Sequence, residues 1–367
     1  MIGAVSLDGI FVLLYKQKSF YLGAILGFEY SQPLFIFLIS MKRACLVICL
    51  LPVFLLFSDC GNVNEVTIPY EEENERIYLP VTVNGKTYRF VFDTGTCSSI
   101  LNYQVAQHDG IYPDSKMKTT IHTVRETFVD TTYCADREFY IGSLEFKRSA
   151  FRLANYNRSF EMGDLLGENE GGILGVKEIR TKNWLFDLKA KTVTVSDNEI
   201  GVEWIGCPQD LCMVVNPDST ETYVDVLLND SLRRTFLFDT GWSSGTKANF
   251  KDREYYWQTG FSVSNSVFQK LKSLRPINGH LQFVSEVKIN NLRLDTVSVS
   301  LLEKEISLFS INPKVIGKDS CIIGTSFLKN FDYMLIDSHN QQIRFYGYHA
   351  ANQGERDFMK SLARKEE

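Results

Sequence analysis

The sequence YRFVFDTG occupies residues 88–95, and TFLFDTG occupies residues 235–241. Each stretch is a run of mainly bulky apolar residues that ends in Asp-Thr-Gly, with Asp93 in the first copy and Asp239 in the second. An apolar run without alternation is typical of a strand that is buried on both faces. Because an unpaired buried carboxylate is costly, two such strands that each end in Asp require a structural or chemical reason.

The two stretches belong to an internal repeat that covers most of the chain. Asp93 and Asp239 are 239 − 93 = 146 residues apart. Three further landmarks occur in the same order in both copies: LPVTVNG at 79–85 and VDVLLND at 224–230, GILG at 172–175 and CIIG at 321–324, and WLFD at 184–187 and MLID at 334–337. A repeat of this kind indicates one structural unit written twice.

The pattern between these landmarks predicts an all-β chain with a few short helices. The dipeptides Asn84-Gly85 and Asn229-Asp230 are typical of hairpin turns between strands. We expect a surface loop over the glycine-rich, acidic residues 163–172. Short helices are expected near residues 102–107, 177–181 and 326–329.

Residues 1–60 are apolar and carry few charges, which sets them apart from the repeat. From Met41 the sequence predicts a secretory signal, because the basic segment 41–43 precedes the apolar segment 44–57. That apolar segment is short for a transmembrane helix, which needs about 20 residues. We expect residues 1–40 to lie upstream of the true start, and a hydrophobic hairpin before the signal is the alternative.

Cys60 ends this leader in a position that resembles the lipid-modified cysteine of a bacterial lipobox. The preceding residues 57–59 match that motif poorly, because the residue before the cysteine is normally small and uncharged. Lipidation of Cys60 and a plain signal, either cleaved or kept as an anchor, are therefore alternatives. In each case the leader predicts an exported protein of a bacterial periplasm or cell envelope, which contacts the membrane only through its N-terminus.

These landmarks divide the chain into five segments. We expect a leader at 1–60, a first lobe at 61–205, a link at 206–222, a second lobe at 223–349 and a polar tail at 350–367. Two cysteines and two prolines interrupt the β-rich pattern in the link.

Composition and charge exclude several classes of protein. Hydrophobic residues make up 44% of the chain and charged residues 23%, which is the balance of a globular protein rather than of a disordered or multi-span membrane protein. The net charge of −5 argues against nucleic acid as a partner, because a phosphate-binding face needs clustered Lys and Arg. The five histidines lack the spacing of a zinc site, so we expect no metal and no cofactor.

Five cysteines follow the leader, and an exported protein can form disulfides. Cys207 and Cys212 could close a small loop, and Cys97 with Cys134 is a second candidate pair. The odd number leaves at least one thiol outside these pairs. The alternative is that all five are small buried apolar residues.

Asp93 and Asp239 meet if the two copies face one another across a pseudo-twofold axis. Two carboxyl groups in contact do not both ionise readily, so they share a proton. One carboxylate then activates a water molecule as a base, and the other carboxyl group protonates a carbonyl oxygen as an acid. The repeat therefore predicts a catalytic pair of aspartates.

The other residues of the two turns are expected to support this pair. Gly95 and Gly241 let the backbone turn closely beneath each carboxyl group. Thr94 and Thr240 can hydrogen-bond across the axis and fix the geometry.

The two Asp-Thr-Gly turns, each after an apolar strand and each followed by an apolar-apolar-Gly segment, resemble the pepsin and retropepsin superfamily of aspartic proteases. The resemblance covers about residues 77–349, and the chain looks like an exported bacterial member with both halves in one polypeptide. It implies an all-β, two-lobed fold and an aspartic endopeptidase that acts as a monomer on a peptide or protein substrate. It also implies that residues 173–175 and 322–324 form supporting strands beneath the aspartates, where Gly175 and Gly324 permit close packing.

Two features depart from the pepsin pattern. Pepsin-like proteins carry a Ser or Thr three residues after the catalytic aspartate; Thr96 keeps this residue, whereas Trp242, followed by two serines, replaces it in the second copy. The flap, which carries a tyrosine in pepsin, is expected at residues 119–133, where Tyr133 is the only tyrosine.

Thr96 and Trp242 differ in what they can donate to the neighbouring carboxyl group. The Thr96 hydroxyl can donate to ionised Asp93, whereas Trp242 offers Asp239 only an indole N–H in a poorer position. Because a hydrogen bond to the charged form stabilises it, we expect the shared proton to reside mainly on Asp239.

Two other functions compete with peptide hydrolysis. A catalytically inactive module could bind a peptide or another envelope protein in the same cleft, and Trp242 and the unclear flap favour that alternative. Glycoside hydrolysis by two carboxylates is weaker, because it needs carboxyl groups about 5 Å or more apart.

Overall fold

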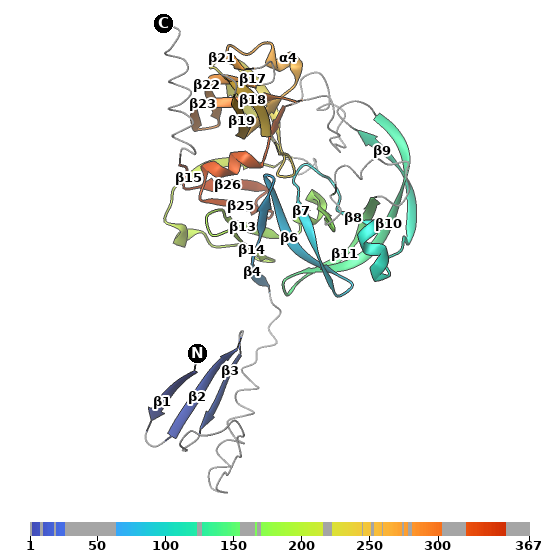
Figure 1. The fold of residues 1–367 in the computed structure, drawn as a ribbon, viewed down its shortest axis with the longest axis vertical. Helices are drawn as coiled ribbons and strands as arrows, with labels where there is room; N and C mark the ends of the chain where they lie inside the picture. The colour runs from blue at the N-terminus through green and yellow to red at the C-terminus, as the bar shows by residue number, and fades with distance from the viewer. Residues whose placement is uncertain are drawn as a thin grey trace. The chain divides into compact units, whose positions relative to one another are not determined.

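The structure, a computed structural model, describes two compact units, Met1–Gly61 and Asn62–Glu367 (Figure 1). The described residues are 2–7, 10–17, 20–25, 64–122, 127–154, 166, 170–215, 222–243, 245–250, 253–258, 260–273, 275–277, 281–302 and 321–349. In the first unit an antiparallel sheet is formed by β1 (Ile2–Leu7), β2 (Ile10–Gln17) and β3 (Phe20–Ile25). The predicted signal at 41–60, with Cys60, and the polar tail lie outside the described residues.

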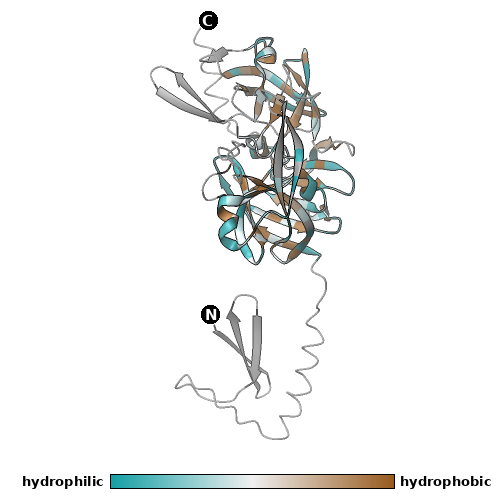
Figure 2. Cartoon of the chain, turned by 90° about the vertical axis from the view of Figure 1, so that its right-hand side faces the viewer, coloured by the Kyte–Doolittle hydropathy of each residue, from teal (hydrophilic) through white to brown (hydrophobic). Residues whose placement is uncertain are grey.

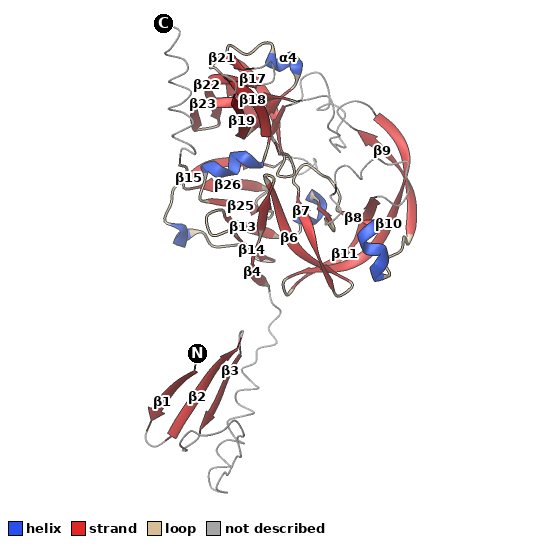
Figure 3. Ribbon diagram, viewed as in Figure 1, coloured by secondary structure: helices blue, strands red, loops and turns tan. Residues whose placement is uncertain are grey.

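The first copy of the repeat forms an eight-stranded sheet (Figure 3). Its strand order is β5-β6-β7-β12-β8-β11-β10-β9, and pairing of β6 with β10 closes it. The strands are β5 (Glu71–Glu73), β6 (Arg76–Val83), β7 (Lys86–Phe92), β8 (Ile100–Asn102), β9 (Ser115–His122), β10 (Thr127–Ile141), β11 (Leu144–Ala154) and β12 (Gly172–Leu174).

The second copy forms a seven-stranded sheet with the same internal connectivity. Its order is β16-β17-β24-β20-β23-β22-β21, and pairing of β16 with β22 closes it, as β6 with β10 does in the first sheet. The strands are β16 (Tyr223–Leu228), β17 (Leu232–Phe238), β20 (Phe261–Val263), β21 (Arg275–Ile277), β22 (Leu281–Ile289), β23 (Leu292–Leu301) and β24 (Cys321–Ile323). The predicted all-β, two-lobed fold is therefore confirmed.

A third, six-stranded sheet joins the two lobes, and the sequence pattern did not predict it. Its order is β15-β26-β25-β13-β14-β4, and β13 pairs antiparallel with β25, Trp184 opposite Ile336. The strands are β4 (Glu65–Pro69), β13 (Asn183–Asp187), β14 (Thr192–Ser196), β15 (Gln209–Val214), β25 (Tyr333–Asp337) and β26 (Gln342–Tyr346). The segment expected to be only a link, 206–222, thus supplies β15 to this sheet. A separate hairpin pairs β18 (Gly245–Phe250) with β19 (Arg253–Gln258).

The expected turn residues close the hairpins. Asn84 and Gly85 have φ of 50° and 76°, and Asn229 and Asp230 have φ of 50° and 56°. Positive φ at both central positions of a two-residue turn matches the twist of the flanking strands, and Asn, Asp and Gly adopt it most easily. These turns therefore fix the register of β6 with β7 and of β16 with β17.

The helices are short, and three of them lie where the sequence predicts a helix. Asn102 caps the first of them, because its side chain accepts a hydrogen bond from the Gln104 N–H at 3.2 Å. The three expected helices are α2 (Tyr103–Ala106), α3 (Val176–Ile179) and the 3-10 helix η4 (Thr325–Asn330). Further short helices are η1 (Gln107–Asp109), η3 (Glu203–Ile205) and α4 (Asn265–Phe268). No helix in the described part of the chain combines the length and the apolar character needed to cross a bilayer.

Aromatic side chains fill a core that both lobes share. Hydrophobic and hydrophilic residues are interspersed along the strands (Figure 2), and the apolar ends of β7 and β17 point their phenylalanines inward. Phe92 has no exposed surface, and its ring lies 5.1 Å from Trp184 and 4.9 Å from Phe186. Phe238 is also fully buried, and its ring packs edge-on against the ring of Phe345 in the joining sheet, with 5.8 Å between the ring centroids. Each Asp-Thr-Gly turn therefore follows a rigid, packed strand.

The expected surface loop at residues 163–172 is partly wrong. Leu166 and Glu170 are buried, and Gly172 begins β12. A side chain at Gly171 would lie 2.3 Å from the Tyr88 Cβ, so this glycine permits close packing rather than an exposed loop.

None of the five cysteines in the described residues takes part in a disulfide, so neither candidate pair is formed. Cys97, Cys134 and Cys321 are buried. The alternative of five small buried apolar side chains therefore fits these three, whereas Cys207 and Cys212 are half-buried. Burial raises the pKa of the Cys134 thiol, which keeps it protonated.

Separate expression of residues 61–205 and 223–349 is expected to give unfolded or aggregated fragments. Each fragment loses the β13–β25 pairing and exposes strand edges and part of a shared core. Circular dichroism and gel filtration of the fragments, alone and mixed, measure this. A folded, monomeric 61–205 fragment would contradict the prediction.

Candidate active site

The two strands β7 and β17 deliver Asp93 and Asp239 to the junction of the lobes. The Asp93 N–H donates to the Leu174 carbonyl at 3.0 Å, which continues the parallel pairing of β7 with β12. The Asp239 N–H donates to the Ile323 carbonyl at 2.9 Å, in the same way, beside β24. Equivalent backbone contacts in the two lobes therefore hold equivalent carboxyl groups.

The structure brings the two carboxyl groups together. Asp93 and Asp239 are 8% and 4% exposed, and each carboxyl group lies against the glycine of the opposite turn, Asp239 against Gly95 and Asp93 against Gly241. Burial and the adjacent Asp93 carboxylate raise the pKa of Asp239 well above its ordinary value. This is the arrangement in which two buried carboxyl groups share one proton. We call this pair the dyad (Asp93 and Asp239).

Gly95 and Gly241 make room for the dyad, each for the carboxyl group of the opposite lobe. A Cβ at Gly95 would lie 2.2 Å from the Asp239 Cγ, and a Cβ at Gly241 would lie 2.4 Å from the Asp93 Cγ. The sequence predicted these glycines for another reason, namely that each lets the backbone turn beneath the aspartate two residues before it. Neither glycine has a positive φ, so the missing side chain, and not an unusual backbone conformation, is what the site requires.

Thr94 and Thr240 bridge the lobes through four hydrogen bonds, and we call them the threonine bridge. The Thr94 Oγ1 donates to the Phe238 carbonyl at 3.0 Å and accepts from the Thr240 N–H at 3.0 Å. The Thr240 Oγ1 donates to the Phe92 carbonyl at 2.9 Å and accepts from the Thr94 N–H at 3.1 Å. Because these bonds are buried and reciprocal, they fix the separation of the two aspartates that follow Phe92 and Phe238.

The two aspartates receive different numbers of donors. The Asp93 Oδ1 accepts from the backbone N–H groups of Gly95 at 2.7 Å and Thr96 at 3.0 Å, and its Oδ2 accepts from the Thr96 hydroxyl at 2.7 Å. The Asp239 Oδ1 accepts from the Gly241 N–H at 2.9 Å, and the backbone N–H of Trp242 also acts on this carboxyl group. Among the described residues, no hydroxyl donates to Asp239. Since donors stabilise the ionised form, the missing hydroxyl acts in the same direction as burial and the adjacent carboxyl group, which raise the pKa of Asp239.

Gly175 and Gly324 lie against the two turns. A Cβ at Gly175 would lie 2.8 Å from the Thr96 carbonyl oxygen, and a Cβ at Gly324 would lie 2.6 Å from the Trp242 carbonyl oxygen. The residues that follow the glycines hold the same carbonyls: the Val176 N–H donates to Thr96 at 2.8 Å, and the Thr325 N–H donates to Trp242 at 3.1 Å.

Ser99 and Glu178 also hold the first turn, and sequence reasoning missed them. Glu178 is 3% exposed; its Oε2 accepts from the Ser99 hydroxyl at 2.6 Å and from the Ser99 N–H at 3.1 Å. The Ser99 Oγ in turn accepts from the Gly175 N–H at 3.0 Å. A single Glu in a short helix carries no sequence signal of burial, so only its place one turn after Gly175 could have pointed to it.

A hairpin occupies the expected position of the flap. β9 and β10 pair from Ser115 opposite Cys134 to His122 opposite Thr127, and the tip at residues 123–126 lies outside the described residues. Tyr133, the tyrosine of that window, is half-buried and packs against the hydrophobic core.

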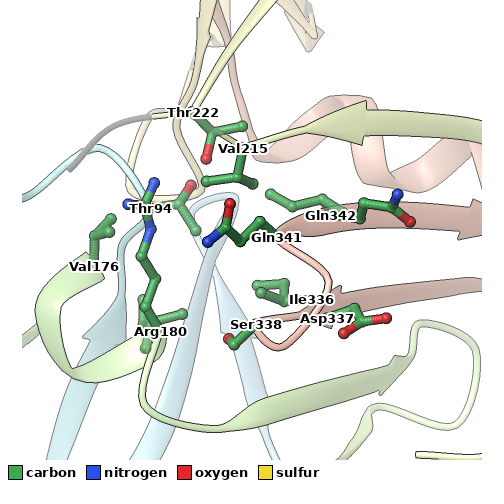
Figure 4. A pocket seen from close by; sticks show the side chains of 12 residues that line it. Thr94, Val176, Arg180, Val215, Thr222, Ile336, Asp337, Ser338, Gln341 and Gln342 are labelled. Carbon is green, nitrogen blue, oxygen red and sulfur yellow. The ribbon is translucent and has the colours of Figure 1, made fainter. Parts of the chain in front are cut away.

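A cavity of about 200 Å³ lies next to the threonine bridge, at the junction of the lobes (Figure 4). Thr94, Val176 and Arg180 line it from the first lobe, and Gln341 and Gln342 line it from the second. Neither member of the dyad lines this cavity. It is therefore distinct from the place where a substrate would meet the carboxyl groups. In the described residues, no cluster of three or more His, Cys, Asp or Glu side chains could hold a metal ion.

Comparisons with known proteins found a family model and solved structures that are similar to this chain. A family model described as aspartyl protease matches residues 79–177, which include Asp93 and Gly175. Among solved structures, an aspartic proteinase from Irpex lacteus is similar to the chain, with 13% sequence identity, a TM-score of 0.46, and coverage of 79% of this chain and 99% of that one. No curated protein matches the sequence. The family match lies within the first copy of the repeat and spans the first Asp-Thr-Gly turn together with β12.

Proposed function

We propose that the chain is an aspartic endopeptidase that hydrolyses peptide bonds by means of a water molecule activated between Asp93 and Asp239. The observation that carries this proposal is the contact of two buried carboxyl groups, one from each lobe, across the threonine bridge. A pair with one shared proton can act as base and acid in the same step.

The proposed reaction uses the asymmetry of the dyad. Ionised Asp93 accepts a proton from the water as the water oxygen bonds to the peptide carbonyl carbon, and protonated Asp239 gives its proton to the carbonyl oxygen. The resulting gem-diol then breaks its C–N bond: the leaving nitrogen takes the proton from Asp93, and one of the two hydroxyl groups returns its proton to Asp239, which restores the dyad. Hydrogen bonds from Gly95 and Thr96 stabilise Asp93 in the ionised form that the first step needs.

Cleavage of a diverse peptide library by the purified chain, analysed by mass spectrometry beside an Asp93→Asn control, tests the proposal. Internal cleavage that is absent in the control is the expected result. A compound with a secondary hydroxyl in place of the scissile bond should inhibit, because its hydroxyl takes the position of the water. Equal failure of both proteins to cleave would favour the second candidate, an inactive peptide- or protein-binding module, which the replacement of the usual Ser or Thr by Trp242 supports.

We also propose that the protein is an exported monomer of the bacterial cell envelope. One chain supplies both carboxyl groups, which supports a monomer, and the basic and apolar leader at 41–60 supports export. Metabolic labelling with a fatty acid distinguishes a lipid anchor on Cys60 from a plain signal, because a Cys60→Ser variant must lose a label that Cys60 carries.

A further inference from the structure

Trp242 occupies the position in the second lobe that Thr96 occupies in the first, but it contacts different groups. The Thr96 hydroxyl donates to Asp93, whereas the Trp242 Nε1 donates to the Ser262 hydroxyl at 3.0 Å. Trp242 is 8% exposed and packs with Leu302 and Ile322. The indole N–H is therefore committed to another strand and does not serve the dyad.

A chain of buried hydrogen bonds continues from this indole. The Ser262 Oγ lies 2.8 Å from the Ser300 Oγ, and the Ser300 Oγ donates to the Phe261 carbonyl at 3.3 Å. Ser262 and Ser300 are 1% and 3% exposed. Since the Ser300 hydroxyl donates its one hydrogen to the Phe261 carbonyl, the Ser262 hydroxyl is the donor to Ser300, and every hydrogen along the chain has an acceptor.

The two serines take the positions of quite different residues in the first lobe. Ser262 pairs with Ile322 on β24 and with Ser300 on β23. In the first lobe, Ile100 on β8 takes the place of Ser262, because it pairs with Ile173 on β12. Arg152 on β11, which also pairs with Ile100, takes the place of Ser300. All three residues, Trp242, Ser262 and Ser300, therefore differ from their counterparts in the first lobe. The small serine side chains leave space for the indole ring, and the Ser262 hydroxyl accepts the hydrogen bond from its N–H.

We infer that Trp242 is a positioning residue that acts through Asp239: the Ser262–Ser300 chain holds the indole N–H away from the dyad, which leaves Asp239 as the protonated acid and Asp93 as the base. This inference rests on the proposed function for its catalytic meaning. The groups that act on Asp239 among the described residues are the Asp93 carboxyl group and the backbone N–H groups of Gly241 and Trp242. A hydroxyl placed at position 242 would give Asp239 a donor of the kind that Thr96 gives Asp93, and the described residues of the second lobe provide no such donor.

The test is a titration of the dyad by carboxyl ¹³C NMR in the full chain, because it needs no turnover. Trp242→Thr and Trp242→Val remove the same packing, but only Thr provides a hydroxyl. We expect the upper apparent pKa of the pair to be lower in Trp242→Thr than in Trp242→Val, by about one unit, since the added donor stabilises ionised Asp239. The alkaline limit of activity should move to lower pH by the same amount.

Trp242→Phe is the companion variant, because it keeps an aromatic ring against Leu302 and Ile322 and loses only the N–H. Its dyad should titrate as in the wild type. Identical titrations of Trp242→Thr and Trp242→Val, or a raised upper value in Trp242→Phe, would overturn the inference. The expected shifts in a chain that cleaves no peptide would leave the inference standing and overturn the proposed function instead.

Discussion

Asp93→Asn and Asp239→Asn should each lower kcat by on the order of 10³-fold or more, while the protein stays folded. In Asp93→Asn the side-chain carbonyl oxygen can still accept from the Gly95 and Thr96 N–H groups, so the first turn keeps its shape. An amide at either position, however, cannot exchange the proton that the reaction passes between water and carbonyl oxygen. Steady-state kinetics on a cleaved library peptide measure the loss.

Stability separates this chemical effect from simple unfolding. Burial and the adjacent Asp93 raise the pKa of Asp239, so ionisation of this carboxyl group is costly in the folded protein. Asp239→Asn puts a neutral amide there, and its thermal midpoint should equal or exceed that of the wild type. The matched control is Asp295→Asn at an exposed position paired with Arg293, which should leave kcat unchanged. An Asp239→Asn protein with near wild-type kcat would remove the dyad from the mechanism.

Gly95→Ala and Gly241→Ala should abolish turnover and destabilise the fold. The added methyl group would stand 2.2 Å from the Asp239 Cγ or 2.4 Å from the Asp93 Cγ, and the threonine bridge prevents the two turns from moving apart. Overpacking of this kind costs about 1–3 kcal/mol. The carboxyl groups must also separate or rotate, so they can no longer share a proton. We therefore expect a near-complete loss of kcat beside a modest loss in the free energy of unfolding.

Gly201→Ala is the matched control for these variants. Its added methyl group would meet only the flexible end of Glu203, at 2.9 Å from the Oε2, and that carboxylate can swing aside. Urea unfolding gives the free energy of unfolding of the three variants, and steady-state kinetics give their kcat. Wild-type kcat in Gly95→Ala would mean that the carboxyl groups do not need the close approach seen in the structure.

Features determined by neighbouring residues could be predicted from the sequence. Asn84-Gly85 and Asn229-Asp230 predict their turns because φ is a local property, and Asp93 and Asp239 could be paired because the repeat implies symmetry. The joining sheet could not be predicted in the same way. An apolar run such as residues 184–186 indicates a buried strand but carries no information about which distant strand lies beside it.

The candidate site was predicted in outline and missed in detail for similar reasons. The glycines of the Asp-Thr-Gly turns were expected, but their reason was not, because the carboxyl group that Gly95 accommodates belongs to the other lobe. Glu178 and Ser262 are ordinary residues in sequence and acquire a role only from the groups beside them, Ser99 and Trp242. Buried polar networks depend on three-dimensional neighbours, which a single sequence does not reveal.

Both halves of this site are encoded in one polypeptide, and that allows them to diverge. In a symmetric homodimer every substitution appears twice, so a change that deprives one aspartate of a donor deprives the other as well. Here Thr96 faces Asp93 while Trp242, with Ser262 and Ser300, stands beside Asp239. In a duplicated chain the sequence itself can therefore determine which aspartate is the acid and which is the base. In two identical subunits the aspartates are equivalent until an asymmetric substrate binds.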